Sequence, residues 1–183
     1  ASAIDQLNCA RTMSKQVARG VGVGFEAPAE HRGLTPGGLS RTNLLGNNRK
    51  LRIGFVSNGF GQHPTGLLTV EFFELLDRAR MQTLLFATAA SDAGPIRQRL
   101  ANVVELICDL THAPAQTSAK KIRELEIDVL FDLRGFGDGG VPELFALRPA
   151  PLQVNWLAYP GTSGAPWIDY VFADAQVIST EVR

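Results

Sequence analysis

Cysteine is scarce in this sequence, with two among 183 residues, Cys9 and Cys108. They lie far apart and form no Cys-x-x-Cys pair, so we expect neither a disulfide framework nor a zinc site, and we expect a reducing compartment. The chain also lacks a His, Cys, Asp and Glu cluster with metal-ligand spacing, a Gly-x-Ser-x-Gly elbow and a Gly-x-x-x-x-Gly-Lys-Ser/Thr phosphate loop. The sequence therefore lacks the usual signatures of metalloenzymes, hydrolases and nucleoside triphosphatases.

An excess of either charge is absent as well. Lys and Arg together number 18, as do Asp and Glu, and the sequence pI is about 7.1. We therefore expect no nucleic acid partner and no anionic lipid surface. No apolar run approaches the roughly 20 residues of a spanning helix, and Asp5, Arg11, Lys15 and Arg19 interrupt the first 20 residues. The sequence predicts no membrane span and no export signal, with the cytoplasm as the compartment.

What the chain does have is enough hydrophobic sequence, 45%, for a substantial core. Residues 3–19 have helical apolar spacing and are followed by a stretch rich in Gly and Pro. We expect residues 1–48 to form a helix and a connecting arm, and residues 49–183 to form the main domain. The glycines at residues 20–24 follow a helix and lead into no strand, so they do not form a dinucleotide fingerprint. Since the sequence lacks an initial Met and ends without a terminating helix, we expect a fragment of a longer protein.

From residue 49 onward, apolar strands alternate with helical segments. Strands that are apolar throughout and separated by helices indicate a parallel sheet covered on both faces, so the sequence predicts an α/β, Rossmann-like doubly wound domain. The expected strands are residues 51–56, 83–88, 103–108, 127–132, 152–157 and 170–173, and the expected helices are residues 67–80, 95–100, 115–126 and 141–147.

Ligands of such sheets bind beyond the carboxyl ends of the strands, which directs attention to the loops at residues 57–66, 89–94, 134–140 and 159–164. The first of these is the richest in functional groups. It contains His63, a residue type suited to acid-base chemistry, immediately before a helix N-terminus that can face an anion. A structural role for a lone histidine is the alternative. His31 and His112 lack comparable support, and Asp132, like Glu143, has an ordinary capping or dipole role.

The loop at residues 159–164 is the second candidate. Pro160, Gly161 and Gly164 cannot continue the preceding strand, and they leave Thr162 and Ser163 with free hydroxyls beside backbone N–H groups. These residue types suit a polar ligand, although an ordinary surface turn has the same composition.

Taken together, the motifs resemble the protein O-GlcNAc transferase family, as a bacterial-type homologue. The resemblance is carried by residues 51–57 with 60–65, by residues 143–153, by residues 156–164 and by residues 169–170. It extends over residues 51–174, and residues 143–164 are its longest and most specific part.

The resemblance implies a GT-B-type glycosyltransferase that moves N-acetylglucosamine from UDP-N-acetylglucosamine to Ser or Thr hydroxyls of proteins, without a metal ion. This chain would be its N-terminal lobe, joined to a tetratricopeptide array and to a second lobe with most of the nucleotide contacts, so the chain alone would bind the donor weakly and be inactive. His63 would be the catalytic residue, as a base or in positioning. Pro160, Gly161, Thr162 and Ser163 would shape the sugar or acceptor side of the cleft.

Two positions depart from the pattern of that family. Gly59 stands where many relatives carry an acidic residue, and Lys120 aligns with a helix carboxylate once suggested as a base. A mechanism that uses this carboxylate therefore has no support here. Two alternatives stay open: the same fold could use another nucleotide sugar such as GDP-fucose, or the chain could be a catalytically silent peptide-binding module.

Overall fold

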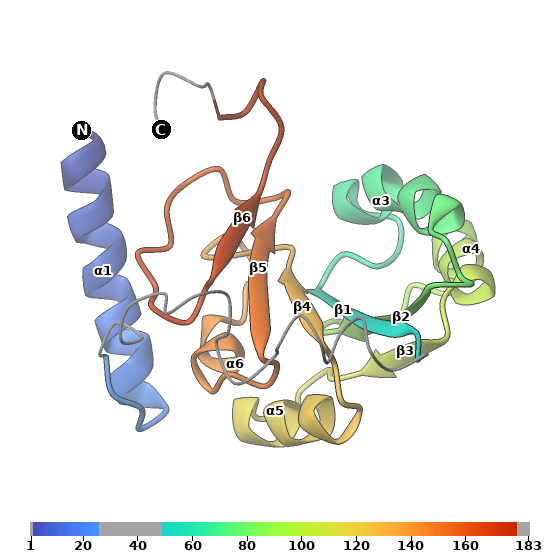
Figure 1. Ribbon diagram of the computed structural model, residues 1–183, viewed down its shortest axis with the longest axis horizontal. Coiled ribbons are helices and arrows are strands. Elements are labelled where there is room, and N and C mark those ends of the chain that lie inside the picture. Colours follow the sequence, from blue (N-terminus) through green and yellow to red (C-terminus); the bar gives the residue numbers. More distant parts are fainter. Residues whose placement is uncertain (1, 26–48, 179–183) are drawn as a thin grey trace.

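The computed structural model describes residues 2–25 and 49–178. In these residues one sheet forms the centre of the molecule (Figure 1). Its strands are β1 (Leu51–Ser57), β2 (Met81–Ala87), β3 (Leu106–Asp109), β4 (Val129–Asp132), β5 (Leu152–Trp156) and β6 (Tyr170–Phe172).

All neighbouring strands are parallel, in the order β3-β2-β1-β4-β5-β6. This is the strand order of doubly wound nucleotide-binding sheets, and it confirms the fold expected from the alternating pattern. The described helices are α1 (Ala3–Gly20), α3 (Pro64–Leu75), α4 (Pro95–Val103), α5 (Ala115–Glu124) and α6 (Pro142–Ala146).

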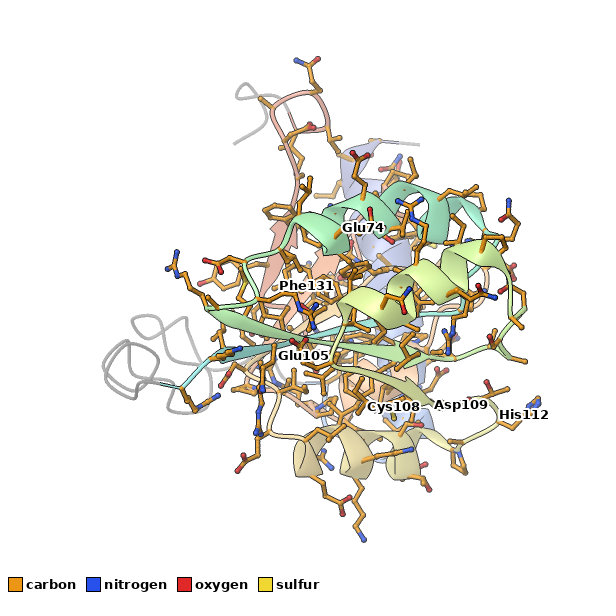
Figure 2. All side chains as sticks on the ribbon, turned by 90° about the vertical axis from the view of Figure 1, so that its right-hand side faces the viewer. Glu74, Glu105, Cys108, Asp109, His112 and Phe131 are labelled. Atoms are coloured by element: carbon orange, nitrogen blue, oxygen red, sulfur yellow. The ribbon has the colours of Figure 1, made fainter. Side chains whose placement is uncertain are left out.

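Helices cover both faces of the sheet, with α3 and α4 on one side and α5 and α6 on the other (Figure 1). Successive strand residues point to opposite faces, so Phe55 joins the α3 and α4 core while Val56 joins the α5 and α6 core. Figure 2 shows the same division, with Phe131 on the α3 side and Cys108 toward α5. Burial on both faces explains why the inner strands are largely apolar.

Helix α1 packs against α6 at the outside of the molecule (Figure 1). It begins with a capping box in which Ser2 and Asp5 exchange hydrogen bonds, and it buries a stripe of small residues, Ala10, Ser14 and Ala18. Within residues 2–25 and 49–178, none of the helices combines the length and the apolar character that crossing a bilayer requires. The division at residue 48 stays a prediction, and the expected arm beyond residue 25, with His31, lies outside the described residues.

Several expected boundaries were wrong, most clearly those of two elements. The helix expected at residues 67–80 begins at Pro64 and ends at Leu75, because Pro64 occupies its first turn and His63 caps it, while an Asp77 turn follows. The strand expected at residues 103–108 starts only at Leu106, since α4 continues to Val103. Both shifts lie at element ends, where apolar periodicity carries little information.

Candidate functional site

The candidate site lies at the carboxyl ends of the strands, where the strand order reverses between β1 and β4. Close contacts bring the expected loops together at this edge. A Cβ placed on Gly139 would lie 1.9 Å from Asn58 Nδ2, and one placed on Gly135 would lie 2.8 Å from Tyr159 Cβ. The loop after β4 therefore touches the loop after β1 on one side and the loop after β5 on the other.

The loop after β1 turns sharply around Gly59. The Gly59 N–H donates to the Oγ of the buried Ser57 at 3.0 Å. A Cβ on Gly59 would lie 2.3 Å from Nδ1 of His63, so the loop needs glycine at this position to admit the imidazole ring. Gly59, one of the two positions that depart from the pattern of the family that the sequence resembles, thus determines where the His63 ring can lie.

His63 is the N-cap of α3 and is half-buried. Its Nδ1 accepts a hydrogen bond from the Thr65 backbone N–H at 3.1 Å. A neutral imidazole whose Nδ1 accepts carries its proton on Nε2, so in this arrangement Nε2 is a hydrogen-bond donor. A proton taken up at Nδ1 would break the cap, and the geometry therefore favours donation and positioning over general-base catalysis.

Asp132 shapes the loop after β4 from inside the protein. Its Oδ1 accepts from the Arg134 N–H at 2.9 Å and the Gly135 N–H at 2.8 Å. Burial raises the pKa of this carboxyl above its ordinary value, although the two backbone N–H groups act in the opposite direction. Asp132 thus has the structural role expected for it, and within the described segments no three His, Cys, Asp or Glu side chains gather as metal ligands.

The loop at residues 159–164 is held by its own hydroxyls and by α1. Thr162 Oγ1 accepts from the Gly164 N–H at 3.2 Å, and Ser163 Oγ accepts from the Ala165 N–H at 3.3 Å. The Ser163 carbonyl oxygen accepts from the buried Ser14 hydroxyl at 2.8 Å. Both hydroxyls are used as acceptors, which leaves their hydrogens for a ligand.

This loop separates two grooves of about 690 Å³ each. Pro160, Gly161 and Thr162 line both grooves, and Ser163 lines the one that continues along β6. The other groove has α1 as its opposite wall. His63 lines neither groove, so the structure places the two predicted parts of the site at the same sheet edge but not in one cavity.

Three residues of this edge escaped the sequence-based selection: Asn58, Asp92 and Tyr159. Asn58 Oδ1 is buried and has no hydrogen-bond partner among the described residues, which is frequent where a ligand or water supplies the donor. Tyr159 packs edge-on against Phe136, with ring centroids 6.0 Å apart. Of the three, Asp92 had a visible signal, because an Asp two residues before Gly94 and three before Pro95 is typical of a turn that starts a helix.

Comparisons with known proteins agree with this architecture. The chain is 42% identical over 130 residues to the UDP-N-acetylglucosamine--peptide N-acetylglucosaminyltransferase of Caenorhabditis elegans, covering 70% of this chain and 11% of that protein. It is 36% identical over 129 residues to the probable UDP-N-acetylglucosamine--peptide N-acetylglucosaminyltransferase SEC of Arabidopsis thaliana, covering 70% of this chain and 13% of that protein. The chain thus spans a small part of the length of these relatives.

A solved structure is also similar. The structure of a Thermobaculum terrenum O-GlcNAc transferase mutant matches with a TM-score of 0.70 and 29% sequence identity, over 92% of this chain and 29% of that one. The sequence model of Glycosyl transferase family 41 matches residues 39–183. On these grounds the chain belongs to glycosyl transferase family 41.

Proposed function

We propose that this chain is the N-terminal lobe of a two-lobed enzyme that transfers N-acetylglucosamine from UDP-N-acetylglucosamine to Ser or Thr hydroxyls of proteins. Family membership and the names of the relatives support the reaction. The single observation that links this reaction to particular residues is the position of His63, which caps α3 beside the point where the strand order reverses.

In this reaction an acceptor hydroxyl attacks the anomeric carbon while the nucleoside diphosphate leaves. The enzyme has to orient the hydroxyl and stabilise the charge that develops on the leaving group. With Nδ1 occupied by the cap, His63 offers its Nε2–H as a donor to an oxygen of the bound substrates. The grooves beside Pro160, Gly161, Thr162 and Ser163 take the sugar or the acceptor peptide in this proposal.

The proposal extends to parts of the protein outside this chain. A second lobe would supply most contacts to the nucleotide, and a tetratricopeptide array would recruit protein acceptors. We further propose that transfer needs no metal ion and takes place in the cytoplasm. Two free cysteines, Cys9 exposed and Cys108 buried, suit a reducing compartment.

The test compares sugar transfer by the full-length protein from UDP-N-acetylglucosamine and from GDP-fucose, with and without EDTA. We expect transfer from the first donor and no effect of EDTA. Transfer from GDP-fucose alone would move the chain to the alternative donor. Binding of acceptor peptides without transfer from either donor would make the chain a silent binding module.

His63→Asn separates the contribution of the imidazole ring from that of the N-cap, because Asn is a strong N-cap residue and keeps the cap while it removes the ring. We expect the variant to keep the folded structure and to lose transfer by roughly tenfold or more, a loss of the size expected when one transition-state contact is removed. The matched control is His112→Asn, since His112 lies exposed in the loop after β3 with φ of 61°, a conformation that Asn tolerates (Figure 2). Transfer at the wild-type rate by His63→Asn would remove His63 from the reaction.

A further inference from the structure

Asp92 connects the loop after β2 to the loop that carries His63. Its Oδ2 accepts from the Gln62 backbone N–H at 2.5 Å, and its Oδ1 accepts from the Gly94 backbone N–H at 3.0 Å. Gly94 is the N-cap of α4 and provides no side chain of its own for capping. One carboxylate therefore ties the start of α4 to the residue that precedes His63.

The chain around Gln62 is shaped to receive this carboxylate. A Cβ on Gly61 would lie 2.5 Å from Asp92 Oδ2, so glycine at this position permits the approach. The carbonyl oxygen of Gly61 accepts from the His63 N–H at 2.8 Å. On the far side, a Cβ on Gly66 would lie 2.2 Å from the same carbonyl oxygen. Residues 61–63 are thus held between Asp92 and the first turn of α3.

Helix α4, which follows Asp92, also contacts the loop that carries His63. Arg97 Nη1 donates to the carbonyl oxygen of Phe60 at 3.3 Å, two residues before the Gln62 contact. Arg97 also lies close enough to Asp92 and Asp109 for their charges to act on it. The hydrogen bonds from Gln62 and Gly94 hold the pKa of Asp92 below its ordinary value, so the group is a carboxylate at neutral pH.

We propose that Asp92 is a positioning residue that fixes the location of His63 in the proposed transfer reaction. Asp92 acts through the backbone of Gln62 and Gly61 and needs no contact with the substrate. The expected effect on kcat rests on the proposed function. The expected effect on the structure, that residues 61–63 depend on Asp92, does not depend on the reaction.

Asp92→Asn tests whether the bridge between the two loops is needed. An Asn side chain has one carbonyl oxygen, so it can accept from the Gln62 N–H or from the Gly94 N–H but can no longer join the two, and its NH₂ group faces the other N–H. Asp77→Ala is the matched control, because Asp77 accepts from the Ala79 N–H in a similar turn before β2, at the opposite end of the sheet.

In the full-length protein we expect Asp92→Asn to lower kcat by roughly tenfold with little change in KM for the donor, as for a lost geometric constraint on a reacting group. The same substitution should have no further effect in a His63→Ala background, because its effect runs through His63. Asp77→Ala should leave kcat unchanged. An equal loss with and without the His63 side chain, or a kcat within twofold of the wild type, would overturn the proposal.

A second measurement shows whether Asp92 holds this loop even if the wild type transfers no sugar. Amide hydrogen exchange at Gln62 and His63 should become faster in Asp92→Asn and stay unchanged in Asp77→Ala, while exchange in α3 beyond its first turn is preserved. Unchanged exchange at Gln62 and His63 in Asp92→Asn would show that Asp92 does not hold this loop. Absence of transfer in the wild type together with faster exchange would instead refute the proposed function and leave the loop contact established.

Discussion

At the scale of single residues, the absence of a side chain at Gly59 decides where the His63 ring can lie. A Cβ there would come within 2.3 Å of Nδ1 and 3.0 Å of Cε1, and since a Cβ does not approach a non-bonded heavy atom as closely as 2.3 Å, the ring would have to leave its capping position. We predict that Gly59→Ala lowers sugar transfer by the full-length protein about as much as His63→Ala, by roughly tenfold or more. We also expect the free energy of unfolding to fall by about 1 kcal/mol, because the N-cap of α3 is lost.

The matched control for this prediction is Gly24→Ala, because a Cβ at Gly24 meets no atom within 4 Å. Initial rates and urea unfolding of the three variants provide the comparison. Full activity in Gly59→Ala would show that the ring can move without consequence for the reaction, and it would also weaken the role given to the Nδ1 cap.

At the scale of the elements, α1 is attached to the loop at residues 159–164 through one buried hydroxyl. Ser14 is fully buried on α1, and its hydroxyl donates to the Ser163 carbonyl oxygen at 2.8 Å. We predict that Ser14→Ala destabilises the protein by about 1 kcal/mol and speeds amide exchange at Gly164 and Ala165, because the loop loses its attachment to α1.

Thr12→Ala is the control on the same helix, since the Thr12 hydroxyl donates to the carbonyl oxygen of Asn8, within α1 itself and on the exposed side. Hydrogen exchange followed by mass spectrometry distinguishes the two variants. If exchange of the loop is the same in both, α1 and the loop are held together by packing alone.

The elements themselves were largely predictable, because their signals are local. Apolar runs and Gly or Pro breaks predicted each described strand and helix from residue 49 onward, and errors were confined to ends such as those of α3. The site was predictable only as a set of loops at one sheet edge. The contact of Asn58 with Gly139 depends on β1 lying beside β4, and the tautomer of His63 depends on one backbone N–H. Residue types alone set neither the packing of distant segments nor the orientation of the His63 ring.

At the scale of the whole molecule, the aromatic core continues to an open edge of the sheet. Phe131, Trp156 and Phe172 pack edge-on in sequence across β4, β5 and β6, with ring centroids 6.2 and 5.7 Å apart. Phe172 is nevertheless 57% exposed and Tyr170 47% exposed. Among the described residues β6 pairs with β5 alone, so its outer side presents unpaired backbone groups next to apolar side chains.

An apolar, unpaired edge strand is a template for pairing with a second chain, and we predict that the isolated 183-residue chain self-associates as its concentration rises. Val171, 60% exposed in the middle of β6, is the position where a charge should oppose this pairing most directly. We expect Val171→Lys to reduce association at least severalfold in sedimentation velocity, because a lysine on an edge strand is costly to bury in a new interface. Leu75→Lys is the control, since Leu75 is 79% exposed at the end of α3 and belongs to no sheet edge. Equal association of both variants would place the contact elsewhere on the surface, and a monomeric wild type at high concentration would mean that the short length of β6 is itself enough to prevent pairing.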